Sequence, residues 1–145
     1  MADLIFRAAT QDDFPAIRAL IHEVGINPTG LDWHRFLVAV TRTGELVGCG
    51  QIKPHADGSR ELASLAVREQ DRGQGVARTL ILRLLEGQPR PIHLMCRARL
   101  GSFYNPVGFR AIGPEVMPPY FRRISRLVHL FNHSVEDGLL VMRLD

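Results

Sequence analysis

The chain has 145 residues, of which 46% are hydrophobic and 23% charged, and this composition is typical of one globular domain. A domain of this length buries enough surface to hold a core without disulfides or a structural metal. No apolar run approaches the ~18 residues that cross a bilayer, which excludes an integral membrane protein. We therefore expect residues 1–145 to form a single domain.

Arginine dominates the positive charge. Lys53 is the one lysine among 18 basic residues, and the formal net charge is +3. Because a guanidinium presents a planar fork of donors to phosphates and carboxylates, this composition favours an anionic ligand somewhere on the surface.

Two features bear on the cellular compartment. Cys49 and Cys96 stand in apolar runs without metal-site spacing, so we expect buried, reduced thiols. The start of the sequence, MADLIFRAA, has an early acidic residue and no long apolar segment, which argues against a secretory signal. We therefore expect a cytoplasmic protein.

The first half of the chain is typical of an antiparallel arrangement. Its predicted elements are a strand over Leu4–Arg7, a helix from Thr10 to about His22, a shorter helix over Asn27–His34, and strands over Phe36–Val40 and Leu46–Ile52. The last two strands flank a turn at residues 43–45 and are expected to pair as a hairpin.

The second half alternates strands and helices. Its predicted elements are a strand over Arg60–Val67, a helix over Val76–Glu86, a strand over Ile92–Arg97, a short helix or turn over Leu100–Pro106, a strand over Phe109–Ile112, a basic amphipathic helix within Pro118–His133, and a strand over Gly138–Leu144. This order predicts a mixed α/β layer fold with one right-handed β-α-β crossover.

The sharpest local pattern is a glycine-rich turn between a buried strand and a helix start. It consists of Arg72, Gly73, Gln74, Gly75, Val76 and Ala77. The first amides of a helix lack partners, so a turn without side-chain bulk lets an anion approach several donors at once. An ordinary turn that uses glycine for its φ angles stays open as an alternative. A Walker loop is absent, and position 78 is arginine where a dinucleotide fingerprint needs glycine.

At these residues the chain resembles the GNAT N-acetyltransferase superfamily. Arg72, Gly75 and Ala77 fit its motif A, [QR]-x-x-G-x-[GA], within a strand-turn-helix over Glu61–Glu86. Phe103–Phe109 fits the F-Y-x-x-x-G-F pattern that follows the fifth strand in that family. The resemblance implies an acyl-CoA N-acyltransferase fold, with one mixed sheet splayed between strands four and five and helices on both faces.

The resemblance also implies where acetyl-CoA binds. The family binds the coenzyme's pyrophosphate through the backbone amides of the turn, here Arg72–Ala77, and pairs its pantetheine arm with strand four, here Leu65, Ala66 and Val67. A strand-four amide would stabilise the oxyanion. The asparagine that many members use to hold the pantetheine arm is replaced by Arg97 in this sequence.

Two side chains take the family's catalytic positions, and the implied reaction is direct transfer to an amine in a ternary complex. Tyr104, which also contacts the coenzyme, would protonate the leaving thiolate. Glu61 would serve as the general base, directly or through water. A packed aromatic and a salt-bridged glutamate at a strand end are the structural alternatives for the two positions.

The acceptor is expected to be a small-molecule or peptide amine, whose identity stays open together with the acyl chain. Trp33, Arg97 and Arg122 are the candidate substrate residues. Acceptor sites in this family use the first helices and the segment before the last strand, which here hold Trp33 and Arg122. Together with Arg99, Arg123 and Arg126, Arg97 and Arg122 could bind a carboxylate or phosphate of the acceptor, or the ribose phosphate of the coenzyme. A solvated helix face is the alternative for the basic segment 118–133.

Other functions fit the sequence less well. A catalytically silent acyl-CoA-binding sensor or interaction module is the main alternative. A nucleic-acid binder is disfavoured because only 7% of residues are aromatic, and most of these stand at core positions. His129 and His133 have the spacing of a metal pair, but no further ligand supports them, so we expect no metal. A homodimer stays open.

Overall fold

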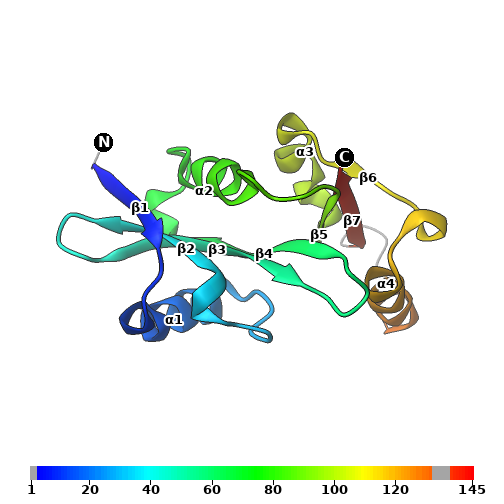
Figure 1. Cartoon of the computed structure of the whole chain (residues 1–145), viewed down its shortest axis with the longest axis horizontal. Coiled ribbons are helices and arrows are strands. Elements are labelled where there is room, and N and C mark those ends of the chain that lie inside the picture. Colours follow the sequence, from blue (N-terminus) through cyan, green and yellow to red (C-terminus); the bar gives the residue numbers. More distant parts are fainter. Residues whose placement is uncertain (1–2, 132–137) are drawn as a thin grey trace. The chain divides into compact units, whose positions relative to one another are not determined.

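The computed structural model describes residues 3–131 and 138–145. By their contacts, residues fall into two compact units: unit 1 is Met1–Lys53 with Leu62–Gln88, and unit 2 is Pro54–Glu61 with Pro89–Asp145. Within the described residues, seven strands form a single mixed sheet in the order β1-β2-β3-β4-β5-β7-β6 (Figure 1). The predicted mixed α/β fold is confirmed.

The elements follow the predicted order closely. The strands are β1 Leu4–Ala8, β2 Phe36–Thr41, β3 Leu46–Pro54, β4 Arg60–Val67, β5 Ile92–Arg97, β6 Arg110–Ala111 and β7 Leu139–Leu144. The helices are α1 Phe14–Val24, α2 Val76–Leu85, α3 Gly101–Tyr104 and α4 Pro119–Phe131. Of the predicted basic segment, residues 132 and 133 lie outside the described residues, and with them His133.

In unit 1, helices cover both faces of the strands. β2 pairs antiparallel with β1 and β3, and Figure 1 shows α1 on one face and α2 on the other. Alternation along β2 explains this arrangement: Val38 packs with Ile17 and Ile21 of α1, whereas Ala39 packs with Leu80 of α2. Each helix thus buries its apolar stripe on one side of the same strand.

In unit 2, alternation along β5 and β7 again separates two faces. Met95 and Val141 pack with Phe121 of α4. On the other face, a Cβ at Gly101 of α3 would meet Leu140 at 2.8 Å, and Leu140 lies opposite Cys96. Figure 1 accordingly shows α3 and α4 on opposite sides of β5 and β7.

The strands β4 and β5 are joined in parallel, with Glu61 opposite His93, and both residues belong to unit 2. Residues in register on neighbouring strands direct their side chains to the same face. Glu61 and His93 therefore share the face that α4 covers. The parallel pairing fits the predicted splay between strands four and five.

The predicted helix over Asn27–His34 is wrong. This segment is a loop that ends in a single 3-10 turn, Trp33–Arg35. The side chain of Asn27 accepts a hydrogen bond from the amide of Thr29, and Gly30 has a φ of 66°, so local turns replace helical hydrogen bonds. The first helix also starts later than predicted, because the capping box of Thr10 and Asp13 opens a 3-10 turn ahead of α1.

The turn between β3 and β4 is tied to the start of α4 within unit 2. Asp57 Oδ1 accepts from the amide and hydroxyl of Ser59, and Asp57 Oδ2 accepts from the amide of Tyr120 at 3.0 Å. Burial opposes ionisation of this carboxyl, but these hydrogen bonds and the charge of His55 lower the pKa of Asp57 to about 2. The Asp57 side chain thus accepts hydrogen bonds both from the turn and from an amide at the start of α4.

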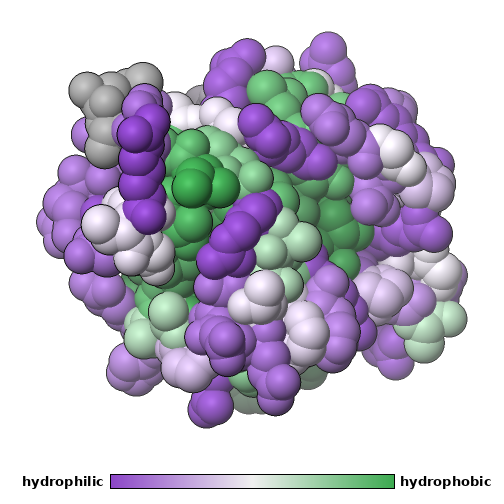
Figure 2. Space-filling model, turned by 60° about the vertical axis from the view of Figure 1, so that its left-hand side comes forward, coloured by the Kyte–Doolittle hydropathy of each residue, from purple (hydrophilic) through white to green (hydrophobic). Residues whose placement is uncertain are grey.

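Polar side chains dominate the surface in view in Figure 2, and apolar ones emerge in gaps between them. In the described part of the chain, every helix is too short or too polar to cross a membrane. The amphipathic pattern that predicted α1, α2 and α4 packs these helices on the strands.

Truncating the buried face of α4 should weaken the fold far more than truncating its exposed face. Phe121 is fully buried, whereas Leu130 on the same helix is 69% exposed. We expect Phe121→Ala to lower the free energy of unfolding by ~3–5 kcal/mol, measured by urea denaturation. Leu130→Ala, the matched control, should change it by less than ~0.5 kcal/mol. Equal losses would contradict this packing.

The link from Asp57 to α4 should depend on pH. Because the pKa of Asp57 is lowered in the folded state, its stabilisation is complete above the unfolded pKa of ~4 and is lost as the pH falls towards 2. We expect Asp57→Asn to lose ~1 kcal/mol at pH 7, and its difference from the wild type to shrink steadily below pH ~4. Urea denaturation across this range measures it, with the exposed Asp12→Asn as control. A pH-independent difference would rule out this interpretation.

Candidate functional site

The glycine-rich turn lies in unit 1, between the end of β4 and the start of α2. Gly73 and Gly75 have φ angles of 79° and 82°, a region that L side chains rarely adopt. Apart from the adjacent residues, no heavy atom of the described chain lies within 4 Å of a Cβ built at either position. The first helical hydrogen bond runs from the amide of Thr79 to the carbonyl of Gly75. The amides of residues 76–78 therefore precede the helical ladder and face an open turn.

Arginine side chains hold this turn against the strand. Arg72 Nε donates to the carbonyl of Val67 at 3.1 Å. Arg68 is paired with Asp71 and with Glu45, and its amide donates to the carbonyl of Val47. The predicted turn residues and the end of β4 are thus brought together, with a geometry set before any ligand binds.

The backbone of β4 departs from a regular strand just ahead of Leu65, Ala66 and Val67. Ser64 has a φ of 58°, which is rare for a residue other than glycine. Ala66 and Val67 are buried and Leu65 is half-buried. Burial raises the pKa of the Cys49 thiol to about 12, although the amide of Ala66 hydrogen-bonds to it. The amide of Ala66 is therefore directed at β3.

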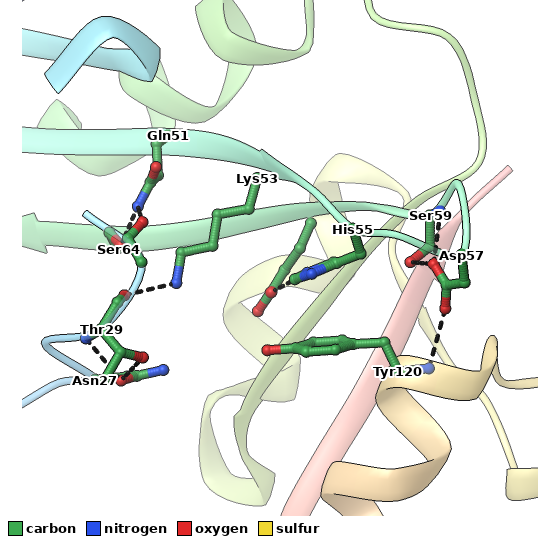
Figure 3. Close-up of polar contacts among 11 residues, drawn as sticks. Asn27, Thr29, Gln51, Lys53, His55, Asp57, Ser59, Ser64 and Tyr120 are labelled. Carbon is green, nitrogen blue, oxygen red and sulfur yellow. Dashed lines mark hydrogen bonds and ion pairs between the residues drawn. The ribbon is translucent and has the colours of Figure 1, made fainter. Parts of the chain in front are cut away.

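A second polar group in unit 1 ties β3 to the loop after α1. Gln51 Nε2 donates to Ser64 Oγ at 2.8 Å, as Figure 3 shows, and to the carbonyl of Gly30 at 3.2 Å. Lys53 Nζ donates to the carbonyl of Thr29 at 2.9 Å, as Figure 3 shows. Both side chains are buried. They fix the loop that carries Trp33 of the predicted acceptor site.

Glu61 lies in unit 2, in a cluster of aromatic and polar side chains that the sequence did not predict. Its Oε1 lies 2.8 Å from His55 Nε2, and the two side chains are only 7% and 12% exposed. The His55 ring stacks on Tyr120 with centroids 3.6 Å apart. Burial, with the nearby charge of Glu61, raises the pKa of Tyr120.

His93 completes this cluster beneath α4. Its ring stacks on Phe121 with centroids 5.1 Å apart, and neither of its buried nitrogens has a hydrogen-bond partner among the described residues. Burial, with the positive charge of Arg143, lowers the pKa of His93. A neutral imidazole therefore lies beside Glu61 on the shared face.

Tyr104 lies on the other face of β5. It ends α3, is half-buried, and meets Phe103 and Phe109 edge to face. Burial raises the pKa of Tyr104 to about 12, with a further contribution from the neighbouring Cys96 once that thiol ionises, so the phenol holds its proton at neutral pH. On β5, Cys96 comes three residues after His93, ~10 Å along the strand, and the two side chains point to opposite faces. Tyr104, the predicted acid, and Glu61, the predicted base, therefore approach β5 from opposite faces.

The candidate substrate residues have different environments. Arg97 ends β5 and is exposed. Arg122 donates to the carbonyls of Pro114 and Met117, so its guanidinium holds the chain ahead of α4. Trp33 is half-buried and stacks on His34 with centroids 3.7 Å apart. Within residues 3–131 and 138–145, no three His, Cys, Asp or Glu side chains gather as a metal site requires.

Sequence reasoning missed His55, Tyr120 and Gln51. A usable signal was present: Gln51 and Lys53 alternate with apolar residues and glycine on β3, and His55, one residue past its end, continues the same spacing. That spacing places polar side chains on one face of the strand, where burial requires partners.

Comparison with known proteins assigns the family. Residues 32–111 match the family model described as "Acetyltransferase (GNAT) domain", which is more than half of the chain. A search of curated proteins gave no match.

Several solved structures share the fold. N-acetylglutamate synthase from Neisseria gonorrhoeae, complexed with coenzyme A and N-acetyl-glutamate, is 23% identical with a TM-score of 0.76, covering 100% of this chain. Only 36% of that protein is covered, so this chain spans about a third of its length.

Two further structures match over their full length. Rv2747 from Mycobacterium tuberculosis, in complex with CoA and NLQ, is 23% identical, with 97% of this chain and 98% of that one covered and a TM-score of 0.72. An acyl-CoA N-acyltransferase from Pseudomonas aeruginosa is 21% identical, with 100% of both chains covered and a TM-score of 0.70. With its family motifs on the expected elements, the chain belongs to the GNAT acetyltransferase family.

Proposed function

We propose that this protein transfers an acetyl group from acetyl-CoA to a primary amine, directly, in a ternary complex. The observation that carries the proposal is the turn over Arg72–Ala77, which leaves amides and open space at the start of α2. A pyrophosphate fits such a turn because it accepts several amide hydrogen bonds and is favoured by the helix dipole. Structures similar to this chain were solved with coenzyme A.

We propose that the backbone of β4 provides the contacts to the rest of the coenzyme. The amides of Leu65 and Val67 are the proposed donors to the pantetheine arm and the developing oxyanion, because the Ala66 amide bonds to Cys49. Gly75, as the last residue before α2, lets the anion approach closely. Acetyl-CoA supplies an activated acyl group, and the protein supplies position and proton transfer.

We assign the two proton transfers to Glu61 and Tyr104. Glu61 takes a proton from the amine, and Tyr104 gives its phenolic proton to the departing sulfur. The raised pKa of Tyr104 supports this role, since the group then arrives at the reaction protonated. For the acceptor, we propose a small amine. Amino acids are the first to test because one similar structure holds N-acetyl-glutamate.

Binding of acetyl-CoA should depend on the turn. At ~100 times its dissociation constant, acetyl-CoA should stabilise the protein by ~2.7 kcal/mol, seen as a rise of several degrees in Tm. Gly75→Ala should weaken binding by ~10-fold or more, since a hydrogen bond to a charged group is worth at least ~1.5 kcal/mol.

Gly58→Ala is the matched control for the strain of the substitution. Gly58 also has a positive φ, 86°, with no heavy atom within 4 Å of a built Cβ. Both variants should lose ~1–2 kcal/mol of stability, but only Gly75→Ala should lose affinity, measured by titration calorimetry. If acetyl-CoA caused no rise in Tm, the proposed function would be refuted.

Turnover separates an enzyme from an acyl-CoA-binding sensor. We expect thiol release from acetyl-CoA with at least one amine from a panel of L-glutamate, L-glutamine, L-arginine, spermidine and a lysine peptide. Tyr104→Phe should lower kcat by ~100-fold with little change in KM for acetyl-CoA, because the phenol acts on the leaving group. Phe103→Leu, its neighbour on α3, serves as control. A fully active Tyr104→Phe would refute the acid role.

A further inference from the structure

The imidazole of His55 is held by contacts from two other elements of unit 2. Nε2 lies 2.8 Å from Glu61 Oε1, Tyr120 stacks on one ring face, and Phe121 stands edge-on with centroids 5.7 Å apart. Only 12% of the side chain is exposed. Packing from α4 therefore fixes the ring plane, and that plane directs one nitrogen at the carboxylate.

The titratable groups around His55 and Glu61 come from the same turn and from β5 and β7. Asp57 on the same turn bears a carboxylate that interacts with His55, and the same carboxylate anchors the amide of Tyr120. On the strand side, His93 of β5 lies in register with Glu61, and Arg143 of β7 lies opposite His93. Because burial and Arg143 lower the pKa of His93, that ring adds no competing charge near neutral pH.

We propose that His55 is a positioning residue for acetyl transfer, which orients the Glu61 carboxylate so that its second oxygen, Oε2, takes the proton of the acceptor amine. This inference rests on the proposed function. When Glu61 is ionised, His55 Nε2 carries the hydrogen and donates it to Oε1. The ring nitrogen that faces Glu61 is then a donor, so proton acceptance belongs to the carboxylate.

The reaction balances with these groups. The amine nitrogen forms a bond to the acetyl carbon and gives one proton to Glu61 Oε2. Tyr104 gives its phenolic proton to the sulfur as the carbon–sulfur bond breaks. Solvent then removes the proton from Glu61 and returns one to Tyr104, which restores both residues. His55 keeps its own proton throughout and acts only through Oε1.

Two substitutions separate orientation from packing. His55→Phe keeps an aromatic ring for Tyr120 but loses the donor, whereas His55→Gln keeps a donor without the ring. His22→Phe, at an exposed position of α1, is the control for replacing a histidine. Thermal unfolding and acetyl-CoA titration of each variant establish that the fold and coenzyme binding persist, and His55→Gln carries the test if His55→Phe does not fold.

With the fastest amine of the panel, we expect His55→Phe to lower kcat by ~10- to 100-fold, the range seen when a group that orients an active-site residue is removed. KM for acetyl-CoA should stay unchanged, and His55→Gln should recover part of kcat. Partial recovery of kcat in His55→Gln is the result that a merely structural histidine would not give, because glutamine restores a donor without restoring the ring.

A readout without acceptor or coenzyme tests the contact itself. The His55 Nε2–H proton should give a protected nitrogen-bound signal in the NMR spectrum of the wild type, and Glu61→Gln should shift or remove it. Full kcat in His55→Phe, beside that signal, would overturn the positioning role alone. If the wild type binds acetyl-CoA but acetylates no amine of the panel, the proposed function fails and the role of His55 fails with it.

Discussion

Burying the carboxylate of Glu61 requires a hydrogen-bond donor at close range, because an ionised group without one loses its hydration and gains nothing in return. His55 supplies that donor from the neighbouring turn. The position of His55 depends in turn on Tyr120, which stacks on its ring. Tyr120 lies at the start of α4, and its amide donates a hydrogen bond to Asp57 of the turn. Much of the packing of unit 2 on this face thus surrounds one charged group.

Because side chains alternate along β5, the two proposed proton-transfer groups lie on opposite faces of this strand. Glu61 and His93 share the face covered by α4, whereas Tyr104 and Cys96 lie on the face covered by α3. An amine and a leaving thiolate need opposite proton transfers, and the two groups would serve them from opposite sides of the strand. The alternation of side chains along β5 is enough to keep Glu61 and Tyr104 apart.

Much of the fold could be predicted from periodicity, because long apolar patterns such as those of β4 and α2 leave few alternatives. The loop over residues 27–34 could not, since side-chain hydrogen bonds at Asn27 and Asp32 compete with a short helix. The turn over Arg72–Ala77 could be recognised because its signal is contiguous. The partner of Glu61 could not, because His55 precedes it by six residues and is brought back only by the hairpin.

The environments of the two cysteines have a practical consequence for any assay that follows coenzyme thiols. Burial raises the pKa of Cys49 to about 12 and that of Cys96 to about 11, so both sulfurs stay protonated at neutral pH. The thiolate, not the thiol, attacks a disulfide reagent, so the folded protein should react with such a reagent slowly. The background in such an assay then reports unfolding of the chain, which makes the same reagent a probe of its integrity.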